Sequence, residues 1–107
     1  MPQTEIEYIC IVQEREFVKS GEPVYRLARV ENFENISVNP MRSFPQQSRI
    51  FLCMQVPKCK MIERSLHLKF RESVKHRTDL GAVYYEADVN RLINIVIMEY
   101  IAKTLDV

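Results

Sequence analysis

An apolar segment near the start of the chain, followed by a polar turn and a second apolar segment, constrains the fold more than any other feature. Ile6–Val12 is nearly all apolar and rich in β-formers, which is typical of a central strand covered on both faces. Lys19–Glu22 contains Ser and Gly and indicates a turn. Val24–Val30 alternates Val and Leu with Tyr and Arg, so we expect a second strand there. The three segments predict a β-hairpin whose loop is lengthened by the polar Gln13–Glu16.

The middle of the chain carries a clear helical signal. Pro57 suits the first turn of a helix, because its missing N–H is not needed there. Four apolar residues follow at spacings of three, four and four, which places Cys59, Ile62, Leu66 and Phe70 on one helical stripe. We therefore predict a helix from Lys58 to about Val74.

The remaining segments complete an α+β order. They are expected to form a short helix over Phe33–Val38, a strand over Arg49–Val56 in the sheet interior, a short edge or connecting strand over Val83–Tyr85, and a last helix with Asp88 as its N-cap. This order predicts a small antiparallel sheet of about three strands flanked by helices. The last helix is expected to bury Val89, Leu92, Ile93, Val96, Ile97, Tyr100 and Ile101. The predicted core consists of Ile9, Ile11, Leu27, Leu52, Leu66, Phe70, Leu92, Ile93, Val96 and Ile97.

Length and composition exclude several classes of protein. The 107 residues suit a single domain over 1–107, and 47% apolar with 27% charged residues is the composition of a soluble globule. No apolar run approaches the roughly 18 residues of a membrane span, and the acidic start does not resemble a signal peptide. We therefore expect no membrane contact and no secretion, but a place in the cytosol, the nucleus or the interior of a particle.

The three cysteines, Cys10, Cys53 and Cys59, are odd in number and have no C-x-x-C spacing. Cys10 and Cys53 lie inside apolar runs. Buried, reduced thiols are therefore expected rather than disulfides or a zinc site.

Basic residues are concentrated in the middle of the chain. From Arg42 to Arg77 there are nine Lys or Arg against two acidic residues, and the flanking stretches are each net acidic. This pattern indicates either one positive face for phosphate contacts or a solvated helix surface. Lys60, Arg64 and Arg71 share one side of the predicted helix at spacings of four and seven. The candidate nucleic-acid-binding residues are Arg26, Arg29, Arg42, Arg49, Lys58, Lys60, Arg64, Lys69 and Arg71.

Four short segments in this order resemble the GIY-YIG endonuclease superfamily, in the branch found in phages and large DNA viruses. They are Tyr-Ile-Cys at 8–10, Tyr-Arg-Leu-Ala-Arg at 25–29, Glu-Arg-Ser-Leu-His at 63–67 and Gly-Ala-Val-Tyr-Tyr-Glu at 81–86. The resemblance covers roughly Tyr8–Ile101 and implies the GIY-YIG fold and a divalent-metal-dependent DNA endonuclease. In that family a helical glutamate, here Glu63, is the principal protein ligand of Mg²⁺, an ion that keeps several waters and binds through few carboxylates.

The chain departs from the family at most catalytic positions. The first-motif glycine and tyrosine are Tyr8 and Cys10, and the second-motif glycine is Ala28. Where the family has a phosphate-stabilising arginine, this chain has Asn35-Ile36-Ser37, and the nearest candidate is Arg42. Losing one such donor typically costs about 10²–10³ in rate. If the chain is active, the resemblance assigns catalysis to Glu63, Tyr8, Arg29 and Arg42, with Mg²⁺ on Glu63.

Three hypotheses about function follow. The first is a catalytically reduced or inactive nuclease-fold domain of viral or phage type, a pseudoenzyme that acts by binding nucleic acid or within a protein assembly. The second is an active Mg²⁺-dependent DNA endonuclease with rearranged residues. The third is a structural virion protein that uses the fold for packing contacts. Fold alone does not choose among them, because function depends on the site.

Overall fold

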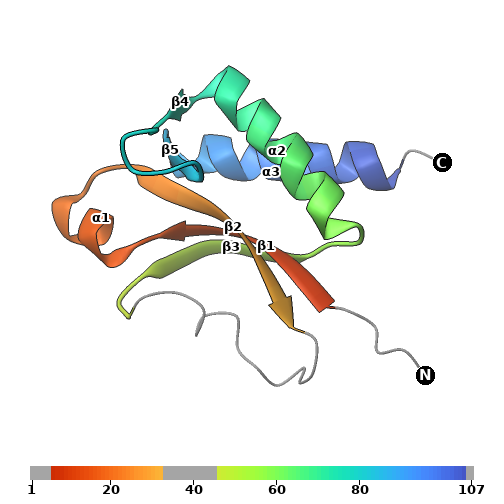
Figure 1. Ribbon diagram of the computed structural model, residues 1–107, viewed down its shortest axis with the longest axis horizontal. Coiled ribbons are helices and arrows are strands. Elements are labelled where there is room, and N and C mark those ends of the chain that lie inside the picture. Colours follow the sequence, from red (N-terminus) through yellow and green to blue (C-terminus); the bar gives the residue numbers. More distant parts are fainter. Residues whose placement is uncertain (1–5, 33–45, 106–107) are drawn as a thin grey trace.

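A computed structural model describes residues 6–32 and 46–105 as an α+β domain, which confirms the predicted fold class (Figure 1). Its five strands form one antiparallel sheet in the order β3-β1-β2-β5-β4, so the sheet has more strands than the three expected. The predicted helix over Phe33–Val38 lies outside the described residues. The elements are β1 (Ile6–Gln13), α1 (Arg15–Ser20), β2 (Val24–Asn32), β3 (Arg49–Gln55), α2 (Cys59–Ser73), β4 (Lys75–His76), β5 (Tyr84–Glu86) and α3 (Val89–Thr104).

The predicted hairpin forms from β1 and β2, and β1 is central because it also pairs with β3. The connection contains a helix that the sequence pattern did not indicate. This six-residue helix, α1, is shorter than a pattern of apolar spacing can reveal, and it has one buried residue, Phe17. It ends at Gly21, whose φ of 77° is a left-handed conformation that glycine adopts without strain.

One prediction about strand positions was wrong, and of the two alternatives for Val83–Tyr85, an edge or a connecting strand, the edge strand is contradicted. The third strand, β3, lies at the edge of the sheet rather than in its interior, and its residues alternate between exposed and half-buried. Only every second residue of its apolar run is therefore partly buried, and the residues between them are exposed. The short strand β5 lies inside the sheet, because β4 pairs with its far side. With two residues, β4 is too short to produce any periodic signal.

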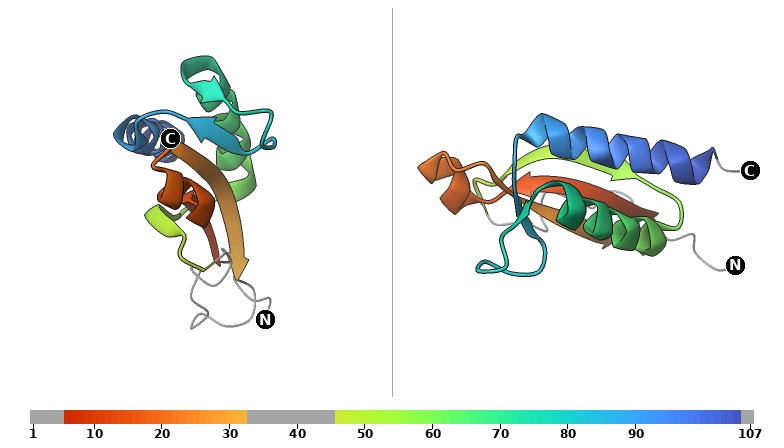
Figure 2. Two further views of the ribbon diagram at one scale, coloured as in Figure 1. Left: turned by 90° about the vertical axis from the view of Figure 1, so that its left-hand side faces the viewer. Right: turned by 90° about the horizontal axis from the view of Figure 1, so that it is seen from above.

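The main core lies between one face of the sheet and the helices α2 and α3, which cover that face together (Figure 2). The predicted stripe of α2 is confirmed: Cys59, Ile62, Leu66 and Phe70 are all at most 1% exposed. They pack with strand residues such as Ile9, Ile11 and Leu27. None of the helices in the described segments is long and apolar enough to span a membrane.

The buried face of α3 differs from the prediction. Leu92 and Val96 are buried and Ile93 is partly buried, but Ile97 and Ile101 are 38% and 44% exposed. Glu99 is buried instead, at 8% exposure. Its Oε1 accepts a 2.6 Å hydrogen bond from the Ser65 hydroxyl of α2 and lies 3.9 Å from Lys103 Nζ. The helix is thus turned so that a satisfied carboxylate, rather than two isoleucines, faces the interior.

Three smaller predictions concern a helix cap, the core residue Leu52 and the cysteines. Asp88 caps α3 as expected, because its Oδ1 accepts a 2.8 Å hydrogen bond from the Asn90 N–H. Leu52 is partly buried against the core. All three cysteines are reduced, and Cys10 and Cys59 are buried, but Cys53 is exposed. Cys53 differs from expectation because it belongs to an edge strand.

Candidate nucleic-acid interface

The exposed side of α2 carries the basic residues that the sequence pattern placed together. Lys60, Arg64 and Arg71 are all exposed, and their spacings put them on one side of the 15-residue helix. Within the described residues, neither Lys60 nor Arg64 has a carboxylate within ion-pair distance. Their charges are therefore available to a ligand. We call Lys58, Lys60 and Arg64 the α2 basic patch.

The start of α2 adds to this positive potential. Its first turn contains no acidic residue, and within the described residues no side chain caps its N-terminal end. The N-terminal end of a helix has a partial positive charge, which acidic side chains usually balance. A shallow depression of about 340 Å³ lies here, lined by Glu7, Lys58, Cys59, Lys60 and Met61. Phosphate groups are the anions that such an arrangement attracts.

Other basic residues predicted to bind nucleic acid lie elsewhere. Lys69 is exposed but lines a groove between α2 and α3. Arg49 pairs with Gln13 at the end of the sheet where α1 lies, whereas α2 starts at the opposite end (Figure 1). Arg42 lies outside the described residues. The structure therefore places Lys60 and Arg64 one turn apart on α2, with Lys58 directly before the helix beside Lys60 and Arg71 further along the helix.

Arg26 and Arg29 of β2 are held in ion pairs. Arg26 Nη1 lies 3.2 Å from Glu14 Oε2. Arg29 Nη1 lies 3.3 Å from Glu7 Oε1, and its Nε lies 3.4 Å from Glu63 Oε1. Because these carboxylates neutralise the guanidinium groups, the two arginines tie the hairpin together and attach α2 to it rather than presenting free charge.

Glu63 belongs to a chain of polar contacts between α2 and the sheet. Its Oε2 lies 4.0 Å from His67 Nε2, and His67 Nδ1 lies 2.7 Å from the hydroxyl of Tyr85, which is fully buried. The ring of His76 stacks on Tyr85 with centroids 4.9 Å apart. Burial lowers the pKa of His67, and Glu63 opposes that fall. The neutral tautomer with its proton on Nε2 accepts from Tyr85 and points its N–H toward Glu63.

The lowered pKa of His67 predicts how stability depends on pH. A folded-state pKa below the ordinary 6.5 means that the unfolded chain binds the proton first as the pH falls. The free energy of unfolding should therefore decrease as the pH drops from about 7.5 to about 5.5, by at most about 1.4 kcal/mol per pH unit. Urea unfolding across this range should show a shallower decrease for His67→Gln. An equal decrease in both proteins would contradict the assignment to His67.

The residues that the resemblance assigns to catalysis do not share one face of the sheet. Glu63 and Arg29 are in contact on the helix-covered face. Tyr8 alternates with Glu7 and Ile9 along β1 and packs on the opposite face, against the cluster of Cys10, Val12 and Ala28. The hydroxyl of Tyr8 and the carboxylate of Glu63 are therefore separated by the sheet itself.

The carboxylate of Glu63, which the resemblance assigns to Mg²⁺, is already paired with a guanidinium group. Arg29 already balances this carboxylate, so a cation would have to displace a guanidinium group. The described segments contain no cluster of three or more His, Cys, Asp or Glu residues able to hold a metal.

Tyr25 of the second motif is 8% exposed and contacts Phe51 edge to face at 5.5 Å, so it is a packing residue.

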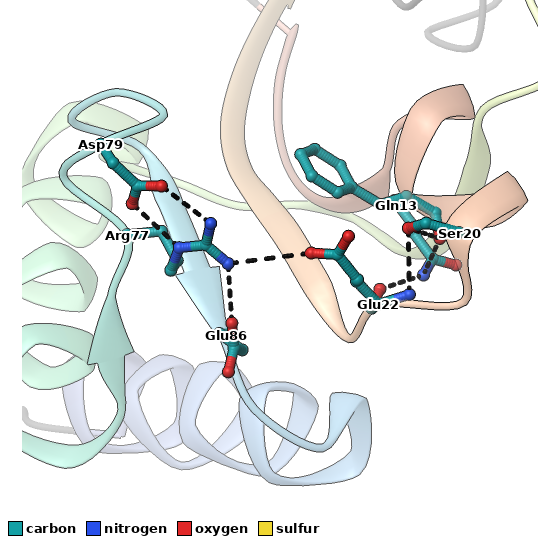
Figure 3. A network of polar contacts seen from close by, with 7 residues as sticks. Gln13, Ser20, Glu22, Arg77, Asp79 and Glu86 are labelled. Carbon is teal, nitrogen blue, oxygen red and sulfur yellow. Dashed lines mark hydrogen bonds and ion pairs between the residues drawn. The ribbon is translucent and has the colours of Figure 1, made fainter.

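A second polar network connects the segment that follows β4 to the turn that follows α1 (Figure 3). Arg77 donates two hydrogen bonds to Asp79, at 2.9 and 2.8 Å, and one to Glu86 at 2.7 Å. It also lies 3.9 Å from Glu22, whose carbonyl accepts a 2.9 Å bond from Gln13. The Arg77 guanidinium holds the pKa of Asp79 at about 2. Arg77 is thus a structural residue, although it belongs to the basic stretch of the sequence.

Sequence reasoning missed the anchoring role of Glu14, which is 8% exposed. Besides pairing with Arg26, it accepts a 2.7 Å hydrogen bond from the Tyr84 hydroxyl. Burial and this hydrogen bond raise the pKa of Tyr84 to about 12. Tyr84 is 70 positions away from Glu14 in the chain, so no local pattern indicates this contact.

No protein-family model, curated protein or solved structure matches this chain.

Proposed function

We propose that this chain is a GIY-YIG-like domain of viral or phage type that binds duplex nucleic acid through the α2 basic patch and does not cleave it. The observation that carries the proposal is a difference among the basic residues. Arg26, Arg29 and Arg77 are neutralised by carboxylates, whereas Lys60 and Arg64 are exposed and lack such partners among the described residues. Unneutralised Lys and Arg beside a helix N-terminus favour phosphate contacts.

Binding through phosphates has a definite physical character. Contacts to the backbone position a protein on nucleic acid but carry no sequence information. Each neutralised phosphate releases condensed counterions, so affinity falls steeply as salt rises. The proposal therefore specifies weak binding with no preference among sequences.

The absence of cleavage is supported by the arrangement of the catalytic candidates. Tyr8 and Glu63 lie on opposite faces of the sheet, and Glu63 contacts Arg29. A general base must be within hydrogen-bond reach of the proton that it removes. Cys10 and Ala28 occupy the family's tyrosine and glycine positions and are buried together in one cluster.

A second candidate function is a contact with another protein in an assembly, as a structural virion component would make. The observation that favours it is the outer side of α3. Ile97, Met98, Ile101 and Leu105 are between 38% and 70% exposed there. Exposed apolar residues that cluster on one surface often mark protein contacts.

The test of the proposed function is an incubation with duplex DNA in the presence of Mg²⁺ or Mn²⁺. At low salt we expect the protein to retard the DNA in a gel equally for unrelated sequences. After removal of the protein, the DNA should be of unchanged length. Cleavage that disappears in Glu63→Ala would overturn the proposal in favour of an active endonuclease. If no retardation occurs at low salt, the protein-assembly function is the better one.

A further inference from the structure

Two cysteines face each other across the antiparallel strands β1 and β3. Cys10 of β1 is the register partner of Cys53 of β3. The Cys10 thiol donates to Cys53 Sγ, with 3.4 Å between the two sulfur atoms. Both are free thiols, so this distance is a non-bonded contact. A modest shift of the two side chains would suffice to bring the sulfurs to bonding distance.

The type of strand pair suits a covalent link. The Val56 N–H donates to the Glu7 carbonyl at 3.2 Å, which makes residues 7 and 56 a hydrogen-bonded pair. Hydrogen-bonded and non-hydrogen-bonded pairs alternate along antiparallel strands, so Cys10 and Cys53 form a non-hydrogen-bonded pair. The Cα atoms of such pairs are about 4.5 Å apart, which lies within the range of about 4.4–6.8 Å found for disulfides. The irregularity in this pairing lies beyond Ile11 and does not disturb it.

The two thiols differ in their surroundings. Cys53 is exposed on the edge strand and can be reached by a dissolved oxidant. Cys10 is 0% exposed and packs with Val12 and Ala28. Burial raises the pKa of the Cys10 thiol and shields its sulfur from dissolved reagents, so Cys53 is the thiol that an oxidant meets first. The third cysteine, Cys59, packs in the other core cluster, beneath α2.

We propose that Cys10 and Cys53 are a redox-sensitive site that forms a reversible cross-strand disulfide upon oxidation by a peroxide. The Cys53 sulfur attacks the peroxide oxygen, the O–O bond breaks, and Cys53 becomes a sulfenic acid with release of one water. The Cys10 sulfur then attacks Cys53 Sγ, the S–O bond breaks, and the hydroxyl leaves as water with the proton of Cys10. In total, two thiols and one hydrogen peroxide give one disulfide and two waters.

The disulfide has a structural consequence. It joins the central strand β1 to the edge strand β3 across 43 positions of sequence, which restricts the unfolded chain. Closing a loop of this length should raise the Tm by the order of 10 °C, and reduction should reverse the rise. Oxidation would thus protect the edge of the sheet against local opening. Transient disulfides of this kind also occur in reducing compartments, where they sense oxidants.

The experiment uses the whole chain, reduced and then freed of reductant. We expect one equivalent of hydrogen peroxide to give a monomer that has lost two hydrogen atoms. Proteolysis without reductant should yield a peptide pair joined through Cys10 and Cys53. Dithiothreitol should restore both the original mass and the original Tm. The exposed position of Cys53 makes Cys53→Ser a variant that should fold normally and show neither the link nor the rise in Tm.

Three outcomes would overturn the proposal. They are a dimer linked through Cys53 of two chains, a sulfinic acid at Cys53 with Cys10 still reduced, and an intramolecular link that includes Cys59. An increase in Tm that persists in Cys53→Ser would also contradict it, because the stabilisation would then have another cause.

Discussion

Replacing Leu66 by alanine is expected to lower the free energy of unfolding by about 2–5 kcal/mol. Leu66 is 0% exposed and lies at the centre of the buried stripe of α2, where it packs in the same cluster as Leu27 and Leu92. Shortening it removes apolar contacts and leaves a cavity that the surrounding sheet and helices fill only in part. Because a small domain is typically stable by only about 5–15 kcal/mol, this is a large fraction of the total. Urea denaturation measures it.

The matched control is Ile97→Ala, which makes a similar change on the exposed side of α3. Its effect should be clearly smaller than that of Leu66→Ala, because Ile97 is 38% exposed and alanine also favours helix. If Ile97→Ala destabilises as much as Leu66→Ala, Ile97 faces the core as the sequence pattern suggested. That result would contradict the orientation of α3 in the structure, where Ile97 is exposed.

The contrast between α2 and α3 explains which parts of the fold can be predicted from sequence. In α2 most apolar residues follow one stripe with charged residues on both sides, although Met61 and Leu68 are exposed outside it, so its buried face can be read from the sequence. In α3 apolar residues occur nearly all round, and their pattern does not select a face. The choice depends on Ser65, which satisfies the buried Glu99 from another helix. Such a contact becomes visible only once the fold is known.

The same argument applies to the candidate site. The basic side of α2 was predictable, because helical spacing places Lys60 and Arg64 together. The neutralisation of Arg29 was not, because Glu7 lies on the partner strand and Glu63 on a distant helix. The positions of Tyr8 and Glu63 on opposite faces follow from the register of β1 beneath α2. Tertiary packing brings Glu63 to Arg29 but places Tyr8 on the other side of the sheet, which the order of the motifs along the sequence does not reveal.

The largest expected effect on binding comes from reversing the charges of the α2 basic patch. In Lys60→Glu/Arg64→Glu, two phosphate contacts are lost, and each is worth about tenfold in affinity at roughly 0.1 M salt. We therefore expect the affinity for duplex DNA to fall about 10²-fold at every sequence alike. The slope of log affinity against log salt should become shallower by about two. Both residues are exposed, so the Tm should change little.

The chain offers a matched control for this reversal. Arg15 and Lys19 of α1 are also exposed, also four residues apart on a helix, and at the opposite end of the sheet from the start of α2 (Figure 1). Arg15→Glu/Lys19→Glu changes the net charge of the protein by the same amount as the α2 reversal. It therefore separates a local contact from a general electrostatic effect.

The most direct test of the central claim is a fluorescence anisotropy titration of labelled duplex DNA with these three proteins over a series of salt concentrations. We predict that the unmodified chain and the α1 reversal bind with nearly the same affinity and salt slope, while the α2 reversal loses affinity and slope together. Equal weakening by both reversals, or no change by either, would contradict binding through the α2 basic patch.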